Sequence, residues 1–232
     1  MDWIDRNRRT VPHRRLVSRD TTTDDRGESV ENLQLYYFAD CGSSGMDDSP
    51  RTPRVPEAGQ FYDWIDLSSQ MALSFKILGR MYDVLGNAEL ASHWEDRAVE
   101  LGDLINAELW CERTRFYYDR MLPKNFVASK TAASFWPMLA GICLEDRTGA
   151  LVEHLLDERE FNRHTPVPTL SADDPNYSPK GTYWYGGVWA PTNYMITRGL
   201  MKAGRSDVAH EIAMKYVGVL ARTFAGYHPN TM

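Results

Sequence analysis

The hydrophobic residues of this chain recur at helical spacing in six stretches that form three pairs. In the first pair, apolar residues from Met71 to Leu85 follow a period close to 3.6 residues, and the pattern resumes from Leu90 to Ile105. The turn pair Gly86-Asn87 separates the two stretches. The first stretch runs from about residue 66 to 86. Two helices joined this tightly predict an antiparallel αα-hairpin.

Two further hairpins are predicted downstream. The second begins at Lys130 with a helix that is nearly all apolar or small, which predicts burial on most sides, and its partner helix begins at Thr148 after the polar break at residues 145–147. The third begins at Pro191, a residue favoured at helix starts, and its partner helix begins at Ser206 after a glycine turn.

The three pairs form an internal repeat. Their first helices begin roughly 60 residues apart, and each first helix is more apolar than the second, which distinguishes inner from outer helices. This double layer predicts an all-α fold, an (α/α)6 toroid of which the chain contains about half. Residues 1–40 are predicted to be an irregular N-terminal segment and 41–232 the partial domain. An open α-solenoid is the alternative, although solenoid repeats are usually shorter, about 34 to 47 residues.

Three long loops, at residues 39–65, 111–129 and 162–190, each enter an inner helix at its N-terminal end. We therefore expect them to gather on one face and to border one concave pocket, and long irregular loops in compact domains are usually functional. They are rich in carboxylates and aromatic rings: Asp47, Asp48, Arg51, Tyr117, Tyr118, Asp119, Tyr183, Trp184, Tyr185 and Trp189.

Composition and charge exclude several classes of partner. The net charge of -6 argues against binding to nucleic acid or anionic lipid. The chain contains no run of the roughly 18 apolar residues that a membrane span needs, and its N-terminus does not resemble a signal peptide, so we expect a cytoplasmic protein. The widely spaced Cys41, Cys111 and Cys143 suit neither a disulfide framework nor a zinc site, and we interpret them as structural thiols.

The loop around Asp47 has the chemistry of a carboxylic-acid catalyst. Hydrolysis of a glycosidic bond needs one acid, one carboxylate that activates water, and aromatic surfaces for the sugar ring. Gly42 and Gly45 allow a tight backbone that a substrate can approach. Because Asp47 and Asp48 are adjacent, they should point in different directions, so only one faces the reaction. The alternative is an ordinary acidic turn.

The run Ser-Gly-Met-Asp-Asp-Ser-Pro-Arg at residues 44–51 resembles the acid loop of the glycosidase clan that contains trehalases, processing α-glucosidases and bacterial mannosylglycerate hydrolases. The resemblance continues at residues 66–70, 131–141 and 183–194, the last reading Tyr-Trp-Tyr-Gly-Gly-Val-Trp-Ala-Pro-Thr-Asn-Tyr. The order and separation of these blocks make the match far more specific than any single block.

The resemblance implies an exo-acting, inverting α-glycosidase for a small α-glucoside or α-mannoside, such as a trehalose-like or glycosylglycerate-like substrate. It implies that Asp47 is the general acid and that no cofactor or metal is needed. Besides this acid, we expect hydroxyl contacts from Arg51 and Asp119. The remaining expected substrate contacts are Tyr117, Tyr118, Trp184, Trp189 and Asn193.

The chain departs from the clan's pattern at several positions. The clan often has Glu in place of Ser43 and Arg in place of Tyr185, so contacts to the sugar or to a charged aglycone should differ. The general base of the clan is a Glu in a Trp-Glu-Asn-Tyr-like run, which is expected about where this sequence ends at Met232, and no Glu follows Glu211. We therefore expect the chain alone to hydrolyse glycosides poorly. A homo-oligomer in which a second copy completes the ring is an alternative that the sequence does not exclude.

Two other function classes remain to be weighed. A sugar epimerase on the same toroid would use histidines, but the six histidines lie mostly on predicted outer helices or far from the aromatic loops. A sugar-binding or scaffold protein without the base is the second alternative. The acidic stretch at residues 20–28 lacks the alternating ligands of a calcium loop, and neither a Ser/His arrangement nor a phosphate-binding glycine loop is present.

Overall fold

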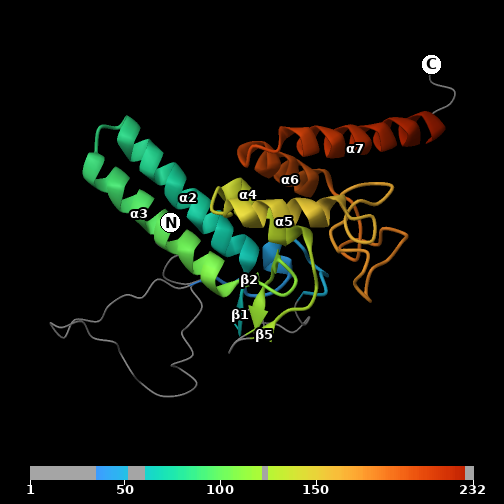
Figure 1. The fold of residues 1–232 in the computed structure, drawn as a ribbon, viewed down its shortest axis with the longest axis horizontal. Coiled ribbons are helices and arrows are strands. Elements are labelled where there is room, and N and C mark those ends of the chain that lie inside the picture. The colour runs from blue at the N-terminus through green and yellow to red at the C-terminus, as the bar shows by residue number, and fades with distance from the viewer. Residues whose placement is uncertain (1–34, 52–60, 122–124, 228–232) are drawn as a thin grey trace.

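The computed structural model describes residues 35–51, 61–121 and 125–227 and contains three αα-hairpins (Figure 1). The first is formed by α2 (Ile65–Val84) and α3 (Ala88–Glu108), as the periodicity predicts. Gly86 adopts a left-handed φ of 74° in the turn, and the Asn87 side chain accepts a hydrogen bond from Leu90 N at 3.1 Å. Asn87 therefore caps α3 by satisfying one of its free amides.

The second hairpin differs from its prediction at both helices. Its first helix is short: a 3-10 turn, η4 (Ala132–Phe135), leads into α4 (Trp136–Ala140), which ends at Gly141 with a φ of 65°. The residues expected to form a polar break are instead the first turn of α5 (Glu145–Leu156). Glu145 and Asp146 favour this start because carboxylates stabilise the positive end of a helix dipole.

The third hairpin, α6 (Ala190–Lys202) and α7 (Ser206–Tyr227), follows the predicted bounds closely. Gly204 adopts the left-handed conformation, with a φ of 76°, in the turn between them. Within the described part of the chain, no helix is long and apolar enough to cross a membrane.

Short strands join the first two long loops. The strand β1 (Tyr62–Asp63) pairs antiparallel with β4 (Arg120–Met121), which pairs in turn with β5 (Asn125–Phe126). A separate ribbon is formed by β2 (Trp110–Cys111) and β3 (Phe116–Tyr117). The backbone thus holds the loop before α2 against the loop after α3, beneath the helices in Figure 1.

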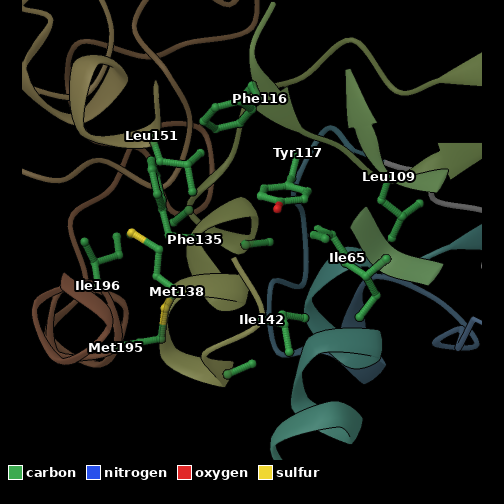
Figure 2. Close-up of a cluster of buried hydrophobic side chains, with 14 of the residues drawn as sticks. Ile65, Leu109, Phe116, Tyr117, Phe135, Met138, Ile142, Leu151, Met195 and Ile196 are labelled. Atoms are coloured by element: carbon green, nitrogen blue, oxygen red, sulfur yellow. The ribbon is translucent and has the colours of Figure 1, made fainter. Parts of the chain in front are cut away.

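The inner helices α2, α4 and α6 contact one another in that order, while α3 packs on α2 and α7 on α6. At Gly199 of α6 an added Cβ would lie 3.0 Å from Leu139 N, so the absence of a side chain lets α6 approach α4 closely. Figure 2 shows part of the hydrophobic core, in which Met138 of α4 and Met195 and Ile196 of α6 belong to the same cluster. The sorting into inner and outer helices is therefore confirmed for the first and third hairpins.

The end of the predicted N-terminal segment packs into this core. Leu35 and Tyr36 are buried, and Tyr36 N donates to Ser68 Oγ at 3.0 Å while Tyr36 O accepts from Trp64 N at 2.9 Å. Residues 1–34 lie outside the described residues, so the boundary at residue 40 stays a prediction.

Candidate active site

The acid loop is a compact turn that presents Asp47 at the surface. A 3-10 turn, η2 (Gly42–Ser44), ends at Gly45, whose φ of 77° is a conformation that favours glycine. The Ser44 hydroxyl donates to Cys41 O at 2.7 Å and accepts from Met46 N at 3.1 Å. Because Met46 is buried and Asp47 is exposed, the loop is anchored beside the carboxylate that it displays.

The two adjacent carboxylates of this loop contact different groups, as expected. The Tyr183 hydroxyl donates to Asp47 Oδ2, and Trp184 N donates to Asp48 Oδ1 at 3.1 Å. Both contacts join residues 136 positions apart in the sequence. The bond to Asp47 raises the pKa of Tyr183, because ionisation of the phenol would lose it.

An aromatic pair lies next to this contact. The rings of Trp184 and Trp189 stack with centroids 4.9 Å apart and an interplanar angle of 4°, and Trp189 Nε1 donates to Tyr183 O at 3.3 Å. Tyr183 itself has a φ of 38°, and a Cβ at Gly187 would lie 2.2 Å from Tyr183 O. This aromatic turn, residues 183–189, thus requires glycine at residue 187 to hold the rings of Tyr183, Trp184 and Trp189 together.

A buried ion network lies below the acid loop. Arg51 Nη2 contacts Asp66 Oδ2 at 2.6 Å, and Arg51 Nη1 lies 3.4 Å from Asp119 Oδ2. The guanidinium also lies 4.4 Å from the centroid of the Trp64 ring. Asp119 Oδ1 accepts from Ile65 N, the first residue of α2, at 2.9 Å. The network therefore joins the acid loop, the second long loop and the start of an inner helix.

In this network the guanidinium of Arg51 lies beside two carboxylates, those of Asp66 and Asp119. Burial raises the pKa of Asp119 to about 6, opposed by the charge of Arg51 and increased by the charge of Asp66. The cause is the cost of a carboxylate charge away from water, which a shared cation offsets incompletely.

Arg51 and Asp119 have partners inside the protein. The two residues are only 1% and 4% exposed. Both are charged groups that contact each other, and Arg51 also contacts Asp66. These contacts hold the acid loop in position, and the expected contacts of Arg51 and Asp119 with sugar hydroxyls stay predictions.

Tyr117 and Tyr118 both lie in the core. Tyr117 is fully buried, its hydroxyl donates to Asn106 Oδ1 at 2.5 Å, and burial raises its pKa. Tyr118 is 5% exposed and packs edge-on against Phe116 at 5.4 Å. Figure 2 shows Tyr117 within the hydrophobic cluster. Both rings pack inside the protein in this structure, and their expected contacts with a sugar stay predictions.

Asn193 likewise has internal partners. Its side chain accepts from Val167 N at 3.0 Å and donates to Val167 O and Trp189 O, both at 3.3 Å. It is 4% exposed. Asn193 therefore fastens the third long loop to α6, and its expected contact with substrate stays a prediction.

The three long loops meet as expected, although a concave pocket around Asp47 stays a prediction. Tyr183 contacts Asp47 across the first and third loops, and Arg51 contacts Asp119 across the first and second. Ser171 N of the third loop donates to the backbone oxygen of Lys130, the residue that follows the second loop, at 2.9 Å. Tyr183 was absent from the predicted contacts. Its place beside Trp184 in an aromatic block was the available signal.

A half-buried histidine and possible metal ligands are the other chemical features of the described residues. His154 on α5 has Glu160 Oε2 at 2.6 Å from Nδ1 and Thr114 O at 2.9 Å from Nε2, which is a structural arrangement away from the aromatic turn. Across the described ranges, no group of three or more His, Cys, Asp or Glu residues could hold a metal ion.

A profile of the mannosylglycerate hydrolase MGH1-like glycoside hydrolase domain matches residues 29–229. The chain belongs to this family. The fold is correspondingly a partial α/α toroid of three hairpins, and the family is described as a glycoside hydrolase domain.

Individual relatives agree with the family. An uncharacterised protein of Borreliella burgdorferi is 29% identical over 173 residues, covering 75% of this chain and 36% of that protein. The cytosolic neutral trehalase of Kluyveromyces lactis is 24% identical over 211 residues, covering 85% of this chain and 28% of the trehalase. The MGH1-like chain thus spans about a third or less of the length of these relatives.

A solved structure supports the fold. The GH63 mannosylglycerate hydrolase from Thermus thermophilus in complex with glucose superposes with a TM-score of 0.70 at 21% identity. The match covers 81% of the MGH1-like chain and 54% of the Thermus chain.

Proposed function

We propose that this chain supplies the general acid, Asp47, of an exo-acting, inverting α-glycosidase. Asp47 protonates the glycosidic oxygen while a water molecule attacks the anomeric carbon from the opposite face. A second carboxylate, about 6.5 to 9.5 Å from the acid in enzymes of this type, activates that water. The observation that carries the proposal is the contact of Tyr183 with Asp47, which joins the acid loop to the aromatic turn.

The contact suits a proton donor for a physical reason. When Asp47 gives its proton to the leaving oxygen, a carboxylate remains, and the Tyr183 O–H donates to that carboxylate. Trp189 is half-buried and stacks on the buried Trp184 beside this contact, so Trp189 is the ring of the pair with exposed surface for the C–H face of a sugar. Tyr118, with its small exposed fraction, borders the second loop as a lesser candidate for this contact.

The substrate we propose is a small α-glucoside or α-mannoside, either trehalose-like or glycosylglycerate-like. The names of the relatives, a trehalase and a mannosylglycerate hydrolase, are the reason for this choice. We also propose residues 41–232 as the partial catalytic domain and the cytoplasm as its location, as for the cytosolic relative.

The test is to make the substitutions in a form of the protein that includes the second carboxylate and is active, and to assay it on trehalose, aryl α-glucosides, glucosylglycerate and mannosylglycerate. Asp47→Asn should lower kcat by about 10² to 10⁴, the usual worth of a general acid, and the matched variant Asp48→Asn should lower it far less. Equal kcat for Asp47→Asn and the parent would reject the assignment.

Sugar binding without hydrolysis is the second candidate, favoured by the stacked tryptophan pair. Tryptophan fluorescence titration with the same sugars distinguishes it from catalysis. Binding without turnover in the form that includes the second carboxylate would favour a sugar-binding protein, whereas turnover that depends on Asp47 would favour the glycosidase.

A further inference from the structure

The third long loop lines an open cavity at the surface, and none of the candidate active-site residues belongs to its lining. Its volume is about 360 Å³, within the range of small-ligand sites. Arg163, His164 and Lys180 contribute to its wall, and no carboxylate does. In a protein with a net charge of -6, this concentrates positive charge at one place.

Arg163 and Lys180 are the two residues of the wall that carry a permanent positive charge. In the part of the chain that the structure describes, no ion pair involves either of them. Arg163 Nη1 donates to the backbone oxygen of Glu158, which brings no full negative charge. By contrast, the nearby Lys130 contacts both Glu160 and Asp173. Unpaired cations around a cavity attract anions, and an arginine can hold a carboxylate or phosphate through two parallel hydrogen bonds.

Backbone hydrogen bonds and tight packing fix the loop around the cavity. Ser178 N donates to Tyr185 O at 2.7 Å, and Gly181 N donates to Ser178 O at 3.0 Å. A Cβ on Gly186 would lie 2.6 Å from the ring of Tyr177, so the tyrosine wall packs directly on the glycine. The cavity is therefore a defined recess in a hydrogen-bonded loop, with Tyr177 and Thr165 adding hydroxyl groups to its wall.

We propose that this cavity binds the anionic group of a small ligand, a carboxylate or a phosphate. Gly181 and Gly186 in its wall flank the turn that brings Tyr183 to Asp47, so an occupant contacts the same turn from a separate site. The proposal concerns binding alone and does not depend on the glycosidase assignment.

The experiment titrates the purified chain with inorganic phosphate and with glycolate at low ionic strength, by calorimetry and by thermal unfolding. We expect saturable binding of at least one anion and a rise in Tm as the anion concentration exceeds Kd. Tighter binding of phosphate would identify a phosphate site, and tighter binding of glycolate a carboxylate site.

Matched variants locate the site. Lys180→Gln and His164→Gln, both at exposed positions, should each raise Kd at least about fivefold, as loss of a charged hydrogen bond predicts. Arg198→Gln, which removes an exposed charge on α6, should leave Kd unchanged. Three results would overturn the proposal: no saturable binding at about 10 mM anion, equal Kd in all variants, or an equal loss in the control. Because no glycoside is used, an inactive enzyme would not affect this result.

Discussion

Replacing Asp119 by Asn tests whether the buried network below the acid loop carries more negative than positive charge. Asn keeps an oxygen that can accept from Ile65 N, the bond that Asp119 makes at 2.9 Å. It cannot ionise, so Arg51 would serve Asp66 alone.

The magnitude follows from the pKa of Asp119, which burial raises to about 6 from the ordinary value of 3.8. Between these pH values the folded state holds a proton that the unfolded state has released. The stabilisation is complete below pH 3.8 and is lost as pH rises through 6. One pKa unit corresponds to about 1.36 kcal/mol, so the folded chain should lose roughly 3 kcal/mol of unfolding free energy over this window.

The assay is urea unfolding of the parent chain and of Asp119→Asn at intervals between pH 4 and 7. The unfolding free energy of the parent relative to the variant should fall as pH rises, most steeply from about 4 to 6. Asp96→Asn on the exposed side of α3 is the control and should show no such slope. A difference between parent and Asp119→Asn that is constant with pH, or that grows with pH, would refute the reasoning.

Two further predictions concern the aromatic turn. Asn193→Ala should lower the unfolding free energy by about 1 to 3 kcal/mol, because it leaves the buried Val167 N–H without its acceptor, and Asn176→Ala at an exposed turn should cost less in the same urea titration. Trp189→Ala should raise Kd for the best-bound sugar by roughly tenfold in a fluorescence titration, since it removes half of the stacked pair; an unchanged Kd would show that the sugar lies elsewhere.

The site could be predicted in part, and the errors share a cause. Loop composition identified Asp47, Trp184 and Trp189, and the structure brings the two loops that carry them together. The same reasoning chose Arg51 and Tyr117 as surface contacts, yet both are buried. Residue type and loop position cannot distinguish an exposed polar group from one whose partner lies on another loop.

The sequence by itself determined the elements whose signals are local. The periodicity of residues 66–105 and 191–224, with glycine and asparagine at the turns, specifies α2, α3, α6 and α7 because helix bonds and caps join residues a few positions apart. The resemblance of its blocks also determined the family. At 145–147 the local pattern misled, since charged residues that resemble a break also suit a helix N-terminus.

Only the tertiary structure decided how distant groups pair. The contact of Tyr183 with Asp47 joins residues 136 positions apart, and the pairing of Arg51 with Asp66 and Asp119 depends on three separate segments meeting. It also decided that Arg163 and Lys180 share one cavity wall. Such contacts depend on how helices and loops pack, and the free energy of burying a charge depends on every neighbour that packing supplies.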